Sequence, residues 1–253
     1  MRPLFSHEGE LALRTLVRSE PLFAFDFDGT LAPIVSRPDD ARVSAAVARA
    51  LARLAERAAV AVVTGRSVAD VRPRLGFEPA FVVGNHGAED TARGVTPDEV
   101  AALELWRRRL DAAAPELAAA GVRVEDKVYS LALHYRLARD RERALASIEH
   151  ALSGLDVRLR TFGGKCVVNI VAASAPDKAE AMFELVGRAR RGSALFVGDD
   201  VNDEAVFERA PPHWVTVRVG LDERNSAARW FVDGPASLAP LLQRLLILLD
   251  DKG

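Results

Sequence analysis

An apolar run that ends in two aspartates constrains this chain more than any other stretch. Leu22 to Phe25 is apolar enough for a buried strand, and it leads into Asp26-Phe27-Asp28-Gly29-Thr30. Side chains at positions i and i+2 of a strand point to the same side, so both carboxylates leave the strand end together. Two close carboxylates repel each other. They therefore need a cation, a shared proton or both.

The same pattern of apolar strand and polar loop recurs along the chain. We expect further strands at 58–63, 81–83 and 194–197, which end in Thr64-Gly65-Arg66, Asn85-His86 and Asp199-Asp200. Alanine- and leucine-rich helical patterns separate these strands. This alternation predicts an α/β fold with a doubly wound parallel sheet. In such sheets, ligand-binding groups gather outside the carboxyl ends of the strands.

The alternation is interrupted between residues 97 and 173. A long helix, an apparent strand pair, a second helix and a second strand pair follow one another there, which is typical of an α+β module. We therefore expect two domains: a core made of 1–96 and 174–253, and an inserted α+β lid made of 97–173. A segment of this length is long for any simple connection.

Bulk composition excludes several classes of function. The net charge is −2, from 34 Lys and Arg against 36 Asp and Glu, so no overall field favours nucleic acid. The single cysteine, Cys166, rules out an internal disulfide and a cysteine zinc cluster. Residues 1–10 hold no apolar run of signal-peptide length, and residues 238–249 are too short to span a bilayer. We expect a cytoplasmic monomer with a small-molecule substrate and no membrane or nucleic-acid partner.

Lys178 adds a cation to the polar strand ends. It lies in the first turn of the helix that follows the lid, where the helix dipole disfavours a positive charge. A solvated surface lysine is the ordinary explanation. Beside the Asp26, Thr64 and Asp199 clusters, a lysine that faces an anion explains the position better.

The order of these motifs resembles a known superfamily. The segment Asp26 to Leu31, then Thr64, then Lys178, then Gly198-Asp199-Asp200-Val201-Asn202-Asp203 is similar to the four motifs of haloacid dehalogenase (HAD) phosphatases. A C2-type cap of that superfamily is inserted where the lid lies. The resemblance extends to trehalose-6-phosphate phosphatases, because the segments 84–89, 130–136 and 164–168 resemble loop and cap motifs of that family.

The resemblance implies a Mg²⁺-dependent phosphatase that removes phosphate from trehalose 6-phosphate in trehalose biosynthesis. Asp26 would attack phosphorus and form an aspartyl-phosphate, and Asp28 would act as general acid and base. Thr64, Gly65 and Lys178 would bind the phosphoryl group. Mg²⁺ would be held by Asp26, the carbonyl of Asp28, Asp199 and Asp203.

The sugar site implied by the resemblance draws on both domains. Alternation on the lid strands sets Ser130, Ala132 and His134 on one face and Leu131 and Leu133 on the other. The candidate sugar-binding residues are Arg66, Asn85, His86, Glu125, Lys127, Lys165 and Asn169. Asn169 stands where the family pattern has a glutamate that is thought to bind the sugar, and Pro-Asp-Lys178 replaces the usual Lys-Gly.

These departures leave other functions open. A phosphatase of another sugar phosphate, such as sucrose or glucosylglycerate phosphate, and a phosphomutase share the same motifs. A phospho-acceptor signalling domain also phosphorylates an aspartate on a doubly wound sheet. Such a domain has no need of an acid at the position of Asp28, nor of a lid.

Overall fold

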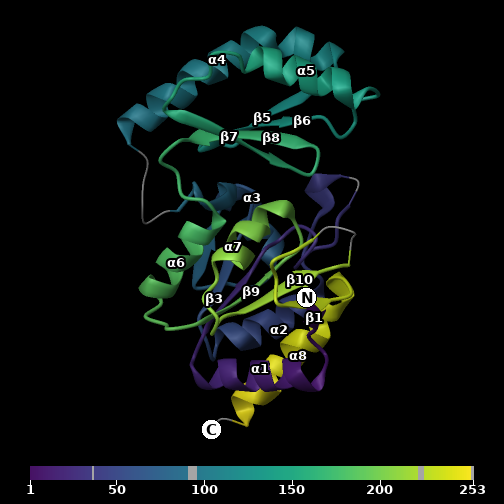
Figure 1. Ribbon diagram of the computed structural model, residues 1–253, viewed down its shortest axis with the longest axis vertical. Helices are drawn as coiled ribbons and strands as arrows, with labels where there is room; N and C mark the ends of the chain where they lie inside the picture. The colour runs from purple at the N-terminus through teal and green to yellow at the C-terminus, as the bar shows by residue number, and fades with distance from the viewer. Residues whose placement is uncertain (36, 91–95, 222–224, 252–253) are drawn as a thin grey trace. The chain divides into compact units, whose positions relative to one another are not determined.

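The computed structural model describes residues 1–35, 37–90, 96–221 and 225–251 (Figure 1). It separates into two compact units, one of Met1–Gly87 with Asp177–Gly253 and the other of Ala88–Pro176. The sequence predicted these two boundaries after residues 96 and 173, whereas the structure divides after residues 87 and 176. Each unit is described by itself below.

The first unit is built on a seven-stranded parallel sheet. Its strand order is β1-β11-β10-β9-β2-β3-β4. The strands are β1 (Arg2–Pro3), β2 (Leu22–Phe25), β3 (Val60–Val63), β4 (Phe81–Val83), β9 (Ala194–Gly198), β10 (Val215–Val219) and β11 (Trp230–Val232). Because β9, β2, β3 and β4 are neighbours, the loops after these strands open side by side at one edge of the sheet.

Helices cover both faces of this sheet. They are α1 (His7–Arg18), α2 (Ala45–Ala55), α3 (Val68–Leu75), α6 (Lys178–Arg188), α7 (Glu204–Arg209) and α8 (Leu238–Asp250), with short 3₁₀ turns η1 (Pro38–Asp40), η2 (Asn85–Gly87), η3 (Val201–Asp203) and η4 (Pro235–Ser237). Side-chain caps define where several of these helices begin. At the start of α3, for example, Ser67 accepts a hydrogen bond from Asp70 N at 3.2 Å.

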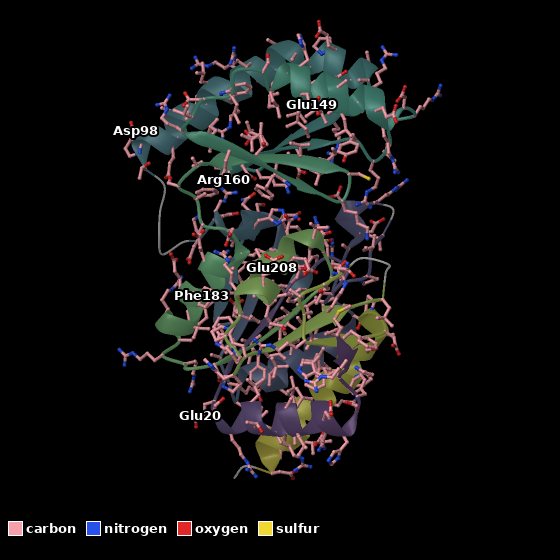
Figure 2. The ribbon with its side chains drawn as sticks, in the orientation of Figure 1. Glu20, Asp98, Glu149, Arg160, Phe183 and Glu208 are labelled. Atoms are coloured by element: carbon pink, nitrogen blue, oxygen red, sulfur yellow. The ribbon has the colours of Figure 1, made fainter. Side chains whose placement is uncertain are left out.

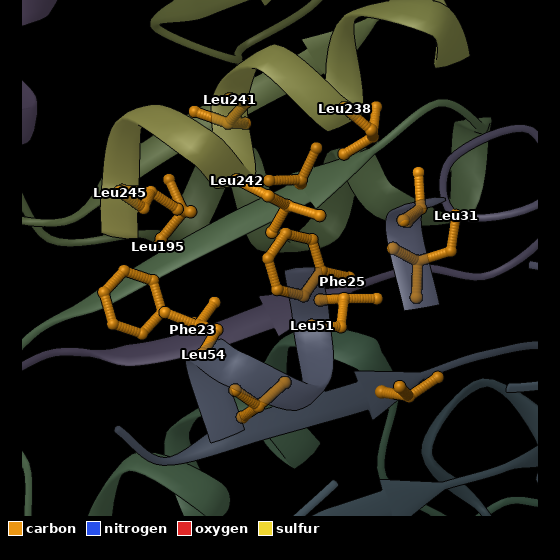
Figure 3. Packing of buried hydrophobic residues seen from close by; sticks show 14 of the residues in the cluster. Phe23, Phe25, Leu31, Leu51, Leu54, Leu195, Leu238, Leu241, Leu242 and Leu245 are labelled. Carbon is orange, nitrogen blue, oxygen red and sulfur yellow. The ribbon is translucent and has the colours of Figure 1, made fainter. Parts of the chain in front are cut away.

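Alternation along β2 divides the core into two layers. Phe23 and Phe25 point to the face that packs on α2 and α8 (Figure 3), whereas Leu22 and Ala24 point to the face covered by α6 and α7. All four side chains are fully buried. Burial of an aromatic side chain such as Phe25 stabilises the fold by roughly 2–3 kcal/mol. The strand that carries Asp26 is therefore held firmly on both sides.

The second unit is a four-stranded antiparallel sheet with two helices. The order β5-β6-β8-β7 joins the two expected strand pairs through β6 and β8. The elements are α4 (Pro97–Ala119), β5 (Arg123–Asp126), β6 (Ser130–His134), α5 (Arg141–Ala151), β7 (Leu159–Gly164) and β8 (Val167–Ala172).

Only one face of this second sheet is packed on the helices. Leu131, Leu133 and Ile170 form a buried cluster with Trp106 and Leu110 of α4, as Figure 1 shows for the helices and strands concerned. On β7, Arg160 points to the side away from α4 and α5 (Figure 2), where its guanidinium lies 5.5 Å from the Phe162 ring centroid. As predicted, Leu131 and Leu133 share the face that packs on the helices, and Ser130 lies on the other face. That other face also carries the apolar side chains of Val171 and Phe162.

The predicted fold class is confirmed: a doubly wound parallel core with an inserted α+β module. The sequence missed β1, because two residues are too few for a periodic pattern. Across the part of the chain that the structure describes, every helix is too short or too polar to cross a membrane.

Candidate active site

Asp26 and Lys178 form a buried ion pair at the carboxyl end of β2. Lys178 Nζ donates to Asp26 Oδ1 at 2.7 Å and to Asp203 Oδ1 at 2.6 Å. The exposed fractions of the three residues are 4%, 2% and 0% for Asp26, Lys178 and Asp203. The lysine is brought here because α6 begins at Lys178, with Asp177 as its N-cap and Glu180 closing a capping box.

Asp199 completes a cluster of three carboxylates. One oxygen each of Asp26, Asp199 and Asp203 lie within 4.8 Å of one another. The Thr30 hydroxyl donates to Asp199 Oδ1 at 3.4 Å. Gly29, with φ +80°, lets Asp199 approach: a Cβ at that position would lie 2.2 Å from Asp199 Oδ2. The backbone after β2 is thus shaped around the carboxylate that follows β9.

The charges of this cluster are strongly coupled. Burial, together with the nearby carboxylates Asp203 and Asp199, raises the pKa of Asp26 despite the opposing charge of Lys178. For Lys178, burial opposes protonation, but Asp203 and Asp26 outweigh it and raise the pKa of the ammonium. The cluster therefore holds three carboxylates and one lysine. This leaves a net negative charge that a further cation would offset.

The cluster fits a hard divalent cation. Three carboxylates at this spacing offer oxygen ligands only, the donor set that Mg²⁺ and Ca²⁺ prefer. Asp203 already accepts from Lys178 at Oδ1 and from Asp200 N, at 2.9 Å, at Oδ2. Asp26 and Asp199 are therefore better placed to contact an ion directly than Asp203.

The loops after β3 and β4 are joined to each other by their backbones. His86 N donates to Thr64 O and Asn85 N to Arg66 O, both at 2.9 Å. Asn85 and His86 adopt φ values of 51° and 57°, in the left-handed region that few non-glycine residues enter and that Asn and His enter more often than most. The Thr64 hydroxyl accepts from Arg66 N at 3.1 Å, so its own proton is free to be donated to another group.

Asp28 has a different partner from Asp26. Its carboxylate receives two hydrogen bonds from Arg66, from Nε to Oδ2 at 2.7 Å and from Nη2 to Oδ1 at 2.8 Å. The Asp28 side chain is 45% exposed, whereas that of Arg66 is 12% exposed. The two aspartates predicted to leave β2 together thus lie in separate environments, one buried on a lysine and the other exposed on an arginine.

The remaining candidates lie in the second unit. Glu125 Oε2 and His134 Nε2 are 2.6 Å apart, and this hydrogen bond lowers the pKa of Glu125. Lys127 follows β5, and Lys165 is exposed between β7 and β8. Asn169 is 1% exposed, and its Nδ2 finds no hydrogen-bond partner among the residues that the structure describes. An unpaired buried amide of this kind is costly unless another molecule completes its hydrogen bonds.

Comparison with known proteins agrees with this arrangement. The sequence model of the trehalose-phosphatase family matches residues 24–236, which is most of the chain. The chain belongs to the trehalose-phosphatase family. The match includes both motifs that build the carboxylate cluster and the whole of the second unit.

Mycobacterial proteins are among the curated relatives of this chain. A trehalose-phosphate phosphatase of Mycobacterium avium is 34% identical over 247 residues, which is 91% of this chain and 63% of the relative. One from Mycobacterium marinum is also 34% identical, over 98% of this chain and 69% of the relative. This chain thus spans a little under two thirds of the length of the first of these relatives.

Solved structures share the fold. The C-terminal domain of Candida albicans trehalose-6-phosphate phosphatase superposes with a TM-score of 0.74 at 22% identity, over 99% of this chain and 98% of that one. A trehalose-6-phosphate phosphatase related protein gives a TM-score of 0.74 at 23% identity, over 92% of this chain and 100% of that one. Identities this low establish the architecture alone.

Sequence reasoning missed three residues that shape the site of this trehalose-phosphatase family member. Asp70 Oδ2 accepts a hydrogen bond from Arg66 Nη1 at 2.7 Å. Arg218, 2% exposed on β10, donates to Glu204 Oε1 at 2.7 Å and to the Asp199 carbonyl at 3.3 Å. A signal for Arg218 was present, because a charged residue interrupts the otherwise apolar strand Val215–Val219. Glu204 and Asp70 carried no such signal, since each looks like an ordinary helix residue.

Proposed function

We propose that this protein is a phosphatase that hydrolyses trehalose 6-phosphate to trehalose and phosphate, in trehalose biosynthesis. The observation that carries the proposal is the buried cluster of Asp26, Asp199 and Asp203 around Lys178 at the carboxyl end of the sheet. Such a cluster supplies a nucleophile and an anion-binding cation together. Family membership and the names of the relatives support the substrate.

Asp26 is the proposed nucleophile. A carboxylate oxygen of Asp26 attacks phosphorus, and the bond between phosphorus and the sugar oxygen breaks. The Asp28 carboxyl group gives its proton to the departing oxygen. In the second half-reaction Asp28 takes a proton from water, which attacks the aspartyl-phosphate and releases phosphate. Burial on β2 and the contact with Lys178 fix the direction of Asp26.

Thr64, Gly65 and Lys178 are the proposed phosphate ligands. The Thr64 hydroxyl has a proton to donate, and the Gly65 N–H belongs to the same loop at the end of β3. Lys178 holds its charge because its pKa is raised by the surrounding carboxylates. Donors and a fixed cation at this place stabilise the charge that develops on the phosphoryl oxygens.

Mg²⁺ is the proposed metal, held by Asp26, the Asp28 carbonyl and Asp199, with Asp203 in support. When bound, it would offset the repulsion between the Asp26 carboxylate and an incoming phosphate. The carboxylate cluster supports this assignment, since its ligands are all oxygens.

For the sugar, we propose as binding residues Asn85 and His86 in the first unit, and Glu125, Lys127, Lys165 and Asn169 in the second. The buried, unpaired Asn169 amide supports a polar ligand at that sheet face. Because Asn169 replaces the glutamate of the family pattern, a related sugar phosphate such as that of sucrose or glucosylglycerate is the second candidate. A cytoplasmic location and a monomeric state remain predictions.

The decisive test compares Asp26→Asn with the parent on a panel of sugar phosphates, with and without Mg²⁺. We expect trehalose 6-phosphate among the best substrates and turnover lowered by at least about 10³-fold in the variant, because an amide is a poor nucleophile. Asp111→Asn, an exposed position on α4, is the matched control. Parent-like turnover of Asp26→Asn would overturn the mechanism, and poor turnover of trehalose 6-phosphate alone would overturn the substrate.

A further inference from the structure

Arg66 is held between two carboxylates and an aromatic ring. One edge of its guanidinium donates to both oxygens of Asp28, and Nη1 donates to Asp70 Oδ2 at 2.7 Å. Its flat face lies over the Phe27 ring, with 5.2 Å between the guanidinium carbon and the ring centroid. Phe27 itself is fully buried. The guanidinium plane is therefore fixed from two edges and one face.

Asp70 is anchored in turn by a second arginine. Arg74, one helical turn further along α3, donates from Nε to Asp70 Oδ1 at 3.1 Å. Arg74 also donates from Nη1 to the Asp39 carbonyl at 2.6 Å, which ties α3 to η1. The Arg74 side chain is only 9% exposed. The contacts therefore connect α3 to Asp28 through charges of alternating sign, in the order Arg74, Asp70, Arg66 and Asp28.

This series of contacts ends at the Asp28 carboxylate, whose orientation the surrounding fold does not fix. Asp28 lies beyond the end of β2 and its side chain is 45% exposed, so the fold itself does little to fix its rotamer. A bidentate arginine fixes both the plane and the direction of a carboxylate, which a lysine cannot do. Arg66 supplies that constraint here.

We propose that Arg66, held by Asp70, is the positioning residue of Asp28. This inference rests on the proposed function, in which Asp28 protonates the departing oxygen. Arg66 fixes the plane of the Asp28 carboxyl group. When Asp28 carries a proton, one of its oxygens keeps the hydrogen bond from Arg66, and the protonated oxygen points its O–H to the departing sugar oxygen, which takes the proton as its bond to phosphorus breaks. The role differs from the sugar contact that the sequence suggested for Arg66.

Leaving groups of different basicity separate these roles. A 4-nitrophenolate leaves readily without a proton, a phenolate less readily, and a sugar alkoxide needs one. The quantity to compare is kcat/KM, which covers the steps up to departure of the leaving group and excludes breakdown of the aspartyl-phosphate. The substrates are 4-nitrophenyl phosphate, phenyl phosphate and trehalose 6-phosphate.

The informative variants are Arg66→Lys and Asp70→Asn. Arg66→Lys keeps the positive charge and loses the bidentate hydrogen bonds to Asp28, and Asp70→Asn weakens the contact that holds Arg66. Arg72→Lys is the matched control on α3, since Arg72 is 46% exposed and pairs only with the exposed Glu78 in the contacts described. Urea denaturation of each variant checks the fold.

For Arg66→Lys, we expect kcat/KM to fall roughly tenfold to hundredfold on trehalose 6-phosphate, less on phenyl phosphate and less than threefold on 4-nitrophenyl phosphate. Asp70→Asn should show the same gradient with smaller losses. Arg72→Lys should change none of the three by more than about twofold.

Three results would overturn the positioning role. Equal losses on all three substrates would make Arg66 a phosphate ligand or a purely structural residue. A loss confined to trehalose 6-phosphate, with both aryl phosphates unchanged, would make it a sugar contact. Parent-like values throughout would leave it without a role. The comparison of the two aryl phosphates tests the role of Arg66 independently of the natural sugar. If the unmodified protein does not hydrolyse trehalose 6-phosphate, that result therefore counts against the proposed function alone.

Discussion

At the scale of single residues, Lys178 shows how chemistry and stability depend on one side chain. Its ammonium is the buried cation that faces Asp26 and Asp203. Replacing it by methionine keeps an unbranched side chain out to Cε and removes the charged ammonium group. Two buried carboxylates would then lack their counter-ion, and removing one partner of a buried ion pair typically costs about 3–5 kcal/mol.

We therefore expect Lys178→Met to lower the free energy of unfolding by about 3 kcal/mol, measured by urea denaturation without Mg²⁺. Lys165→Met is the control, because Lys165 is exposed and the same substitution there should be close to neutral. Equal stability of Lys178→Met and the parent would show that the carboxylates do not depend on this lysine.

The same residues mark what the sequence could and could not predict. Asp26, Thr64 and Asp199 could be assigned to one site, because each follows a strand end and parallel strand ends meet at one edge. Lys178 could be added as a cation in the first turn of a helix, where the helix dipole disfavours it. The pairing of Asp28 with Arg66 could not. A sequence shows that acids and bases are present, but which arginine reaches which carboxylate depends on loop geometry and rotamers.

At the scale of elements, the strands and helices were predicted well and their ends less well. β2 and β4 have the expected bounds, since apolar runs define them, whereas the strand expected over 58–63 begins at Val60. The helix after the lid begins at Lys178, because Asp177 accepts the capping hydrogen bond from Glu180 N. Helix starts follow the cap that forms, and several candidate caps compete in a polar loop.

The C-terminal end of α7 depends on Arg229, a contact no sequence pattern indicated. Its Nη1 donates to the carbonyls of Pro212 and Trp214 at 2.7 and 2.6 Å, and Nη2 to those of Ala210 and Pro211, both at 2.8 Å. All four carbonyls belong to residues that follow the last residue of α7, and among them Pro211 O also accepts from Trp214 N at 3.0 Å. A planar guanidinium can serve all four at once, whereas a lysine ammonium cannot.

We expect Arg229→Lys to destabilise the protein by roughly 1–3 kcal/mol, because carbonyls at the end of α7 lose their donors. Thermal or urea denaturation measures the loss. Arg53→Lys, at an exposed position on α2, is the control and should change stability by less than about 0.5 kcal/mol. An Arg229→Lys variant as stable as this control would mean that water replaces the guanidinium at no cost.

At the scale of the whole molecule, residues far apart in the chain meet in the first unit. Glu10 of α1 and Arg244 of α8 pair through two hydrogen bonds, one of them from Arg244 Nε to Glu10 Oε2 at 2.7 Å. Arg14 also donates to Glu10, at 2.7 Å. The hydrogen bond from Arg244 is the main cause that lowers the pKa of Glu10 below its ordinary value of 4.5.

This shift gives a pH dependence of known sign. A carboxylate whose pKa is lower in the folded than in the unfolded chain adds stability above the unfolded pKa, and that stability is lost as the pH falls through the folded pKa. Glu10→Gln should therefore be less stable than the parent at pH 7, and the difference should close as the pH falls below about 4. Since the Glu10 side chain is still 30% exposed, screening by solvent keeps the difference below about 1 kcal/mol.

Urea denaturation of the parent, Glu10→Gln, Arg244→Gln and the double variant at pH 7, 5, 4 and 3 measures this coupling. We expect the two single variants to lose more stability in sum than the double variant loses at pH 7, and the coupling to vanish at pH 3. It should also shrink in 1 M salt, where the Debye length is about 3 Å. Coupling that persists at pH 3 would mean that α1 and α8 are joined by packing at these positions and not by the charge of Glu10.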